Sequence, residues 1–174
     1  MSPARHPIRG DVLGLQPEAT NAFWRLYGTL WSHGTVDQAT KEVARLRNAR
    51  VTGCRYCQNV RFEGAREAGL TEDRVELIHD EYDSTALSPR EKTVIRFVDT
   101  FLTDPHDLTG TQRDDLLAHF DAGQLVELTT GVALFMGFSK IAVALGPPPT
   151  CRPWWSPPRT GHRSTRSAPA PHGP

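Results

Sequence analysis

The sequence predicts an all-α fold with about seven helices, and two observations support this prediction. Apolar residues recur at steps of three and four, for example at Val43, Leu46 and Ala49, which is the spacing of one helix face. A serine, threonine or aspartate followed three residues later by glutamate or glutamine, a pattern that begins helices, also recurs along the chain. A convincing alternation of apolar and polar residues, typical of a half-buried strand, is not found.

The first two expected helices combine an aromatic-rich segment with an apolar seam. Residues 21–32 are amphipathic, and Gly34 is expected to end this first helix. Thr35, with Gln38 three residues later, predicts the N-cap and capping box of the second helix. Its apolar seam includes Glu42, a carboxylate in a row of otherwise apolar residues.

The third helix is expected to begin near Cys54 and to end at Gly69. Leu70 and Val75 then have the spacing of a hydrophobic staple around the start of the next helix. Three further helix starts are predicted by pairs of residues three positions apart: Ser88 with Glu91, Thr109 with Gln112, and Asp121 with Gln124.

The chain divides into three parts by composition. Residues 1–19 are expected to be a mobile lead-in, and residues 20–146 form one helical domain. Residues 147–174 contain nine prolines among 28 residues and lack Leu, Ile, Val, Phe and Met, so we expect a disordered tail. Within it, Cys151 is expected to be an unpaired thiol and Trp154-Trp155 an undocked aromatic pair.

Composition and charge narrow the classes of function. The chain has 20 basic and 20 acidic residues, so its net charge gives no reason to expect nucleic acid as a partner. The N-terminus lacks the basic and apolar regions of a secretory signal, which favours the cytoplasm. The longest uncharged apolar stretch, residues 128–139, is 12 residues long and too short to span a membrane, so a buried core helix is expected there.

The pair Cys54 and Cys57 is the strongest functional signal in the chain. On one helix that begins near residue 54, these cysteines and Arg61 would share a face. The helix N-terminus and the charge of Arg61 would then favour the thiolate, the form that attacks peroxides and disulfides. A Cys-x-x-Cys pair in a reducing compartment is more often redox-active or metal-binding than structural.

Other interpretations of these residues remain open. Two cysteines in a helical protein can be inert core thiols, and a zinc site would need further ligands at a spacing that the histidines do not show. Glu42 is a candidate general base because it lies on an apolar seam. It is equally well placed to pair with Arg45 or with Arg50.

The segment from Glu42 to Arg61 resembles a known family. Glu-x11-Cys-x-x-Cys contains Arg-Leu-Arg-Asn-Ala-Arg-Val-Thr-Gly before the cysteines, and Ala-Gly-Leu-Thr-Glu-Asp follows them. This pattern is similar to the alkylhydroperoxidase D-like branch of the carboxymuconolactone decarboxylase family. The resemblance covers roughly residues 20–146, and its specific part is residues 42–61. It implies an alkylhydroperoxidase D-like helical bundle that assembles as a homo-trimer or hexamer.

The resemblance also implies roles for individual residues. Cys57 would attack the peroxide, Cys54 would resolve the intermediate and exchange with the reductant, and Glu42 would begin a proton relay. The redox branch has histidines where this chain has Tyr56 and Arg61. An arginine can stabilise a thiolate but cannot shuttle a proton at neutral pH, whereas Tyr56 could donate a hydrogen bond to a peroxide oxygen.

The sequence therefore predicts a thiol-dependent hydroperoxidase or disulfide oxidoreductase with an antioxidant role. It would need no bound cofactor or metal, and the resemblance implies an external dithiol, such as a lipoylated carrier protein, as reductant. Two alternatives are a carboxymuconolactone decarboxylase-type enzyme of aromatic catabolism and a non-catalytic oligomeric module of the same fold. The Cys-x-x-Cys pair argues against the decarboxylase, whose reaction does not depend on it.

Overall fold

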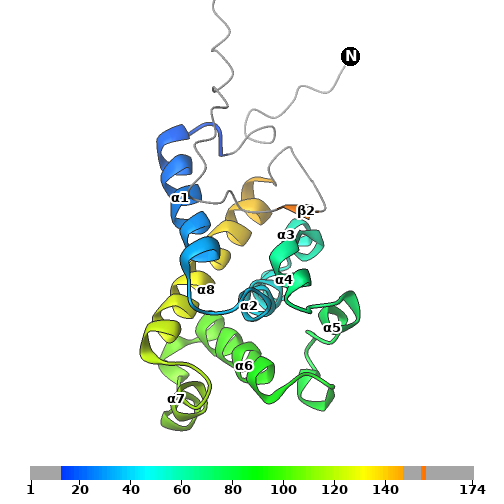
Figure 1. The fold of residues 1–174 in the computed structure, drawn as a ribbon. Helices are drawn as coiled ribbons and strands as arrows, with labels where there is room; N and C mark the ends of the chain where they lie inside the picture. The colour runs from blue at the N-terminus through cyan, green and yellow to red at the C-terminus, as the bar shows by residue number, and fades with distance from the viewer. Residues whose placement is uncertain (1–12, 147–153, 156–174) are drawn as a thin grey trace, which may run out of the picture.

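The computed structural model describes residues 13–146 and 154–155, and this part of the chain is almost entirely helical (Figure 1). The all-α prediction is confirmed. In chain order the described helices are α1 (Pro17–His33), α2 (Gln38–Val51), α3 (Arg55–Asn59), α4 (Glu63–Glu67), α5 (Glu72–Glu76), α6 (Pro89–Thr103), α7 (Gly110–Leu117) and α8 (Ala122–Leu145). Short 3-10 turns span Tyr82–Ser84 and Pro105–Asp107, and two-residue strands are β1 (Arg61–Phe62) and β2 (Trp154–Trp155).

Helix α2 lies at the centre of the domain. Every residue from Thr40 to Ala49 is buried, including the charged side chains Lys41, Glu42 and Arg45. Its main partners are α6 and α8, with α3 and α4 packed beside it, and α1 lies along α8 (Figure 1). A helix surrounded on all sides positions its neighbours accurately, and the segment that follows it carries the Cys-x-x-Cys pair.

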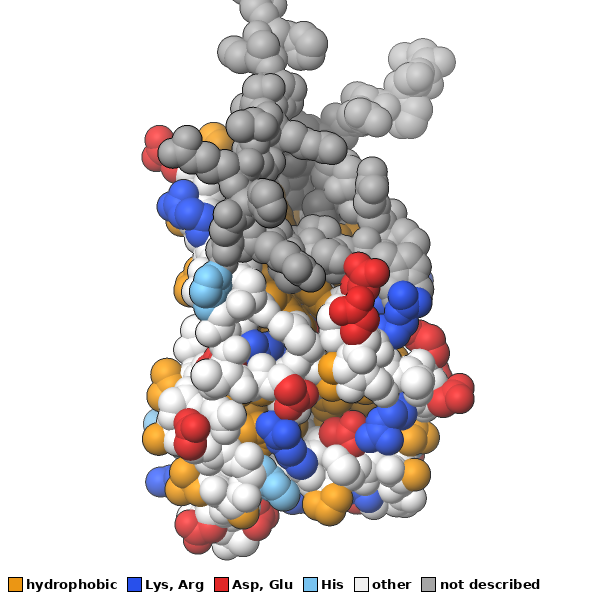
Figure 2. Space-filling model, viewed as in Figure 1, with side chains coloured by type: hydrophobic (Ala, Val, Ile, Leu, Met, Phe, Trp, Pro, Cys, Tyr) orange, Lys and Arg blue, Asp and Glu red, His pale blue; other side chains and the backbone are white. Residues whose placement is uncertain are grey.

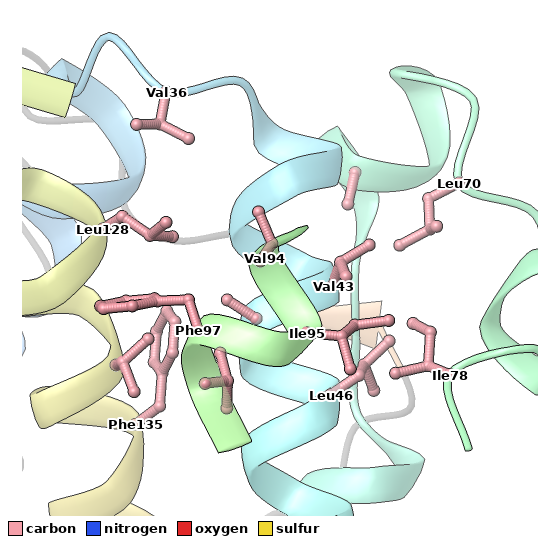
Figure 3. Close-up of a cluster of buried hydrophobic side chains, with 14 of the residues drawn as sticks. Val36, Val43, Leu46, Leu70, Ile78, Val94, Ile95, Phe97, Leu128 and Phe135 are labelled. Carbon is pink, nitrogen blue, oxygen red and sulfur yellow. The ribbon is translucent and has the colours of Figure 1, made fainter. Parts of the chain in front are cut away.

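The hydrophobic core forms where α2, α6 and α8 meet. Figure 3 shows Val43 and Leu46 of α2 beside Ile95 of α6, with Phe135 of α8 on the other side. Burying an aliphatic or aromatic side chain of this size stabilises the fold by about 1.5–3 kcal/mol. The seam predicted along the second helix is therefore a core face.

Most predicted helix starts are confirmed. Ser88, Thr109 and Asp121 each accept a hydrogen bond from the amide three residues later, and the side chain at that later position bonds back to complete a capping box. Leu70 and Val75 are both buried on either side of the N-cap of α5, as a hydrophobic staple requires.

Two expected boundaries were wrong. Helix α1 begins at Pro17 rather than at residue 21, with proline in the first turn. The N-cap of α2 is Asp37, whose carboxylate accepts from the amide of Thr40 at 2.8 Å, and not Thr35. The amide of Thr35 donates instead to Glu127 of α8 at 2.7 Å, so a distant carboxylate takes Thr35 out of the local capping role.

The expected single helix from Cys54 to Gly69 is broken in the middle. Helix α3 ends at Asn59, Val60 is extended, and β1 follows before α4 begins. Val60 and Phe62 are both buried in the main core. Positions i and i+2 lie on nearly opposite sides of a helix but on the same side of an extended chain, so burying both residues favours the break.

Strand β2 lies parallel to β1, with Trp154 opposite Arg61 and Trp155 opposite Phe62. This pairing differs from the expectation that the two tryptophans are undocked. The remaining predictions for the tail at 147–174 and for Cys151, and the lead-in prediction for residues 1–12, lie outside the described residues.

Helix α8 is 24 residues long and begins after Asp121, as its capping pattern predicted, so it extends beyond the uncharged stretch 128–139 at both ends. It is long and apolar enough to cross a membrane by length and composition alone, a test that the core helix of a soluble protein also passes. Leu128, Val132 and Phe135 belong to the core, whereas Val126 and Val143 are 67% and 56% exposed. The helix is thus a core element with a second, partly exposed apolar side.

Charged side chains are spread over the surface. Acidic and basic groups are interspersed on the face shown in Figure 2. Some of them are paired across elements, as Arg96 is with Asp83 at 3.1 Å.

Candidate active site

A glycine turn ends the central helix α2 and leads directly into the cysteine pair. The amide of Gly53 donates to the carbonyl of Arg50 at 3.1 Å, and the amide of Cys54 donates to that of Ala49 at 2.9 Å, the two bonds of a Schellman motif. Gly53 has a φ of 66°, a left-handed conformation that glycine adopts most easily. The chain therefore reverses at Gly53, and Cys54 begins the next helix.

Cys54 is the N-cap of α3, and its sulfur accepts a hydrogen bond from the amide of Cys57 at 3.2 Å. The two cysteines are joined by a disulfide, with Cα atoms 5.3 Å apart. Cys54 is 1% exposed and Cys57 is 4% exposed. The pair is thus a buried disulfide at a helix N-terminus, a position that favours thiolates when the bond is reduced.

Apolar groups surround the two sulfur atoms. Cys54 and Cys57 form a small core cluster with Ala49 of α2 and Ala142 of α8. The rings of Tyr56 and Phe138, whose centroids are 6.2 Å apart, pack against this cluster. Phe138 continues into an aromatic group of α1, with ring centroids 6.0 Å from Phe23 and 5.5 Å from Trp24.

Two polar side chains that sequence reasoning missed also reach the site. The hydroxyl of Ser139 in α8 donates to Cys57 Sγ at 3.3 Å. Ser139 Oγ in turn accepts a hydrogen bond from Asn48 Nδ2 of α2 at 2.9 Å. Asn48 and Ser139 are 0% and 1% exposed, so this contact lies inside the protein.

Glu42 forms a buried ion pair with Arg45, one of the two pairings that the sequence left open. Arg45 Nε donates to Glu42 Oε2 at 2.7 Å, and Nη2 donates to Oε1 at 2.6 Å. The same guanidinium donates to the carbonyls of Cys57 and Val60, each at 2.6 Å. Arg45 therefore joins α2 to the carbonyl end of α3, the helix that carries the cysteines.

The ion pair and its burial shift the pKa values of ionisable groups around it. Burial alone would lower the pKa of Arg45, but Glu42 raises it above its usual value. Burial raises the pKa of Tyr27 well above its usual range, an effect that Arg45 opposes and Glu42 reinforces. Tyr27 belongs to the core, and its aromatic pattern in the sequence gave no sign that it lies near a charged group.

Arg61 lies outside the face that it was expected to share with the cysteines. It belongs to β1, beyond the end of α3, so the spacing argument for a common helix face was wrong. Its Nε donates to Glu72 Oε1 at 2.9 Å, and its Nη1 donates to the carbonyls of Gln58 and Val60. The ion pair with Glu72 weakens the expectation that the charge of Arg61 acts on the thiolate.

Tyr56 lies between the two cysteines in the sequence and is half-buried against Phe138. This placement agrees with a packing role, and its proposed hydrogen bond to a peroxide oxygen remains a prediction. Among residues 13–146 and 154–155, no three His, Cys, Asp or Glu side chains are arranged so that they could hold a metal ion.

The fold and the site together define a helical domain in which a buried Cys-x-x-Cys disulfide follows a central helix that carries a buried glutamate. The sequence profile of the carboxymuconolactone decarboxylase family matches residues 17–100. Over these residues the chain is similar to the family, and its domain shares the fold of solved structures with an alkylhydroperoxidase D-like core.

Solved structures share the fold at low sequence identity. A protein of unknown function from Agrobacterium tumefaciens, provisionally assigned as the antioxidant defence protein AhpD, has a TM-score of 0.69 at 22% identity. The match covers 79% of this chain and 94% of that one. An uncharacterized peroxidase-related protein from Ralstonia eutropha JMP134, with an alkylhydroperoxidase AhpD core, has a TM-score of 0.68 at 17% identity. This match covers 79% of this chain and 74% of that one.

Relatives by sequence are themselves uncharacterized. YdfG of Bacillus subtilis is 25% identical over 117 residues, which are 64% of this chain and 77% of YdfG. Rv2313c of Mycobacterium tuberculosis is 31% identical over 111 residues. That alignment covers 64% of this chain but 39% of the relative, so the chain spans well under half of the mycobacterial protein.

Proposed function

We propose that this protein is a thiol-dependent peroxidase or disulfide oxidoreductase that uses the Cys54–Cys57 pair in an antioxidant role. The observation that carries the proposal is the disulfide itself, buried at the N-terminus of α3 behind a glycine turn. The family and the peroxidase-related proteins that share the fold support the same class of activity. The reaction would use no bound cofactor or metal.

The oxidative half-reaction begins at Cys57. Its thiolate attacks one oxygen of the hydroperoxide, an S–O bond forms, the O–O bond breaks, and the alkoxide that leaves takes a proton to become an alcohol. The Cys54 thiol then attacks the sulfur of the Cys57 sulfenic acid. The disulfide forms, and the hydroxyl group leaves as water with the thiol proton of Cys54. Because both sulfurs are buried, neighbouring side chains must move to admit the hydroperoxide.

The reductive half-reaction needs two electrons from outside the chain. We propose that one thiol of a dithiol carrier protein of the lipoyl type attacks Cys54, forms a mixed disulfide and releases the Cys57 thiolate. The second thiol of the carrier then attacks this mixed disulfide, so that the carrier's own disulfide forms and Cys54 leaves as a thiolate. The setting would be the cytoplasm, where such reductants keep thiols reduced. Neither nucleic acid nor a membrane has a part in this scheme.

Glu42 could begin a proton relay only under a structural condition. Both of its carboxylate oxygens accept hydrogen bonds from Arg45, so one of these bonds must open before the carboxylate takes a proton. The contacts support a positioning role for the pair, in which Arg45 holds the carbonyls of Cys57 and Val60. A relay through Glu42 would be added to that role.

Thiol counting after one equivalent of hydroperoxide tests the proposal. We expect the thiols of Cys54 and Cys57 to disappear together, with one equivalent of alcohol formed. Cys57→Ser should abolish hydroperoxide consumption, whereas Cys54→Ser should leave Cys57 as a sulfenic acid or mixed disulfide, visible by mass spectrometry. Oxygen on Cys54 would reverse the assigned roles. Unchanged thiols in the wild type would reject the redox proposal and leave the decarboxylase-type enzyme or the non-catalytic module.

Self-association is part of the proposal. The exposed apolar side chains include several that lie on α1 and α8: Leu26, Val126, Ile141, Val143 and Leu145. Covering them in a homo-trimer or hexamer would remove apolar surface from water. Sedimentation at micromolar concentration should show a trimer or a multiple of it, and a monomer would contradict this part of the proposal.

A further inference from the structure

We propose that Ser139, oriented by Asn48, is a catalytic residue whose hydroxyl stabilises the thiolate of Cys57 by a hydrogen bond. The inference rests on the proposed thiol chemistry and deepens it, because it assigns a group from α8 to the sulfur that reacts. The Ser139 hydroxyl lies 3.3 Å from Cys57 Sγ and donates to it. Serine and cysteine are separated by 82 positions in the sequence.

The direction of the hydrogen bonds follows from the number of donors. Asn48 Nδ2 donates to Ser139 Oγ at 2.9 Å. A hydroxyl has one hydrogen, and with Asn48 as donor to the oxygen, that hydrogen is free to point at the sulfur. The chain of donors therefore runs from Asn48 through Ser139 to Cys57. It supplies positive potential where the thiolate carries its charge, in a buried setting where such a bond is strong.

Ser139 behaves differently from another hydroxyl on the same helix. A helical serine or threonine usually turns its hydroxyl back to the carbonyl four residues earlier. Thr129 does so, with a bond of 2.7 Å to the carbonyl of Leu125. Ser139 donates across the helix interface to Cys57 instead. Asn48 Nδ2 donates to Ser139 Oγ, whereas Asn48 Oδ1 is buried without a hydrogen-bond partner among the described atoms, an arrangement that costs stability.

The charged groups near the two cysteines do not replace the Ser139 hydroxyl as a donor to the sulfur. On α2, Glu42 and Arg45 neutralise each other, and Arg45 reaches the backbone carbonyl of Cys57. Beyond α3, the guanidinium of Arg61 is paired with Glu72. On α8, Lys140 follows Ser139 in the sequence and is exposed. The Ser139 hydroxyl, in contrast, donates directly to the sulfur.

One hydrogen bond would serve both half-reactions. When hydroperoxide is reduced, the Cys57 thiolate is the nucleophile, and when the external dithiol attacks Cys54, the Cys57 thiolate is the leaving group. A donor to Cys57 Sγ increases the fraction of thiolate available as nucleophile in the first case. In the second case it stabilises the departing thiolate, which therefore leaves faster. The hydroxyl supplies no base, so the protons of the reaction still need another carrier.

The test measures the thiolate directly, without hydroperoxide. The reduced full-length protein is alkylated with iodoacetamide across a pH series, and the Cys57 peptide is followed by mass spectrometry. Ser139→Ala should raise the midpoint of the Cys57 profile by about one pH unit, a roughly tenfold loss of thiolate at a fixed lower pH. Asn48→Leu should raise it by less, since the hydroxyl remains but is no longer oriented. Thr129→Ala is the matched control and should leave the midpoint unchanged.

Two further measurements keep the result interpretable. Ser139→Thr retains a hydroxyl at the same position and should restore most of the wild-type midpoint, and circular dichroism reports whether each variant is folded. A midpoint unchanged in Ser139→Ala, or equally displaced in Thr129→Ala, would overturn the inference. The profile is independent of peroxidase turnover, so a wild type that fails to reduce hydroperoxide would reject the proposed function while the alkylation shift still reports on Ser139.

Discussion

Replacing Arg45 by methionine removes the guanidinium that joins α2 to the segment carrying the cysteines. Four hydrogen bonds are lost: two to the carboxylate of Glu42 at 2.7 and 2.6 Å, and one each to the carbonyls of Cys57 and Val60 at 2.6 Å. Methionine fills a similar volume, so the substitution removes charge and donors with little change in packing. Glu42, which is 1% exposed, is left as a buried carboxylate without its partner.

The expected cost is large compared with the stability of a single domain. Breaking a buried ion pair by removing one partner costs about 3–5 kcal/mol, and domains of this kind are stable by about 5–15 kcal/mol in total. The double variant Glu42→Leu/Arg45→Met removes the unpaired charge as well. We expect it to be more stable than Arg45→Met, because the remaining loss is that of the donors to two backbone carbonyls.

Equilibrium urea denaturation, followed by circular dichroism at one fixed protein concentration, measures these differences. Arg50→Met is the matched control on the same helix, since Arg50 bonds to the single carbonyl of Val75 and lies 4.0 Å from Glu76. It should lose about 1 kcal/mol or less. A loss below about 1 kcal/mol for Arg45→Met, or a double variant less stable than the single one, would refute the argument that Arg45 anchors the cysteine helix.

Three further predictions follow from single contacts. Burial opposes the ionisation of Glu127, but Lys41 and two backbone amides lower its pKa, so its stabilising effect is present above the ordinary glutamate pKa and is lost as the pH falls through the lowered pKa. The difference in urea midpoint between the wild type and Glu127→Gln should therefore shrink on acidification. Arg61→His should leave the Cys57 alkylation midpoint within about half a pH unit, because Arg61 is paired with Glu72; a larger shift would show that its charge reaches the sulfur. Gly53→Ala should destabilise the protein by about 1–2 kcal/mol in the same denaturation assay, because the residue has a φ of 66°.

The helix starts were predictable where the deciding contacts are local. Ser88, Thr109 and Asp121 each bond to an amide three residues away, so the sequence contains all the partners of the cap. Thr35 satisfied the same local pattern and was wrong. Glu127 of α8 accepts from its amide and hydroxyl, and Asp37 caps α2 instead. Local patterns thus propose several starts, and a contact 92 positions away in the sequence selects between them.

The break after α3 was not predictable from helix patterns for a related reason. Residues 54–69 contain no proline, and the periodicity does not mark Val60 as extended. The break becomes necessary only when Val60 and Phe62 must face the same core, which the positions of the other helices decide. The error moved Arg61 from the predicted reactive face to an ion pair with Glu72.

The same difference between local patterns and long-range contacts applies to the residues of the candidate site. Cys54, Cys57 and Glu42 lie within one short segment, where spacing alone indicates chemistry. Ser139 lies in an apolar run that reads as core, and Asn48 lies on the buried helix, so neither has a local pattern that distinguishes it from a packing residue. Their role comes from the packing of α2 against α8, which brings Ser139 to the sulfur and Asn48 to Ser139. A motif therefore identifies the reacting atoms, whereas the groups that set their reactivity are supplied by whichever helices the fold packs against them.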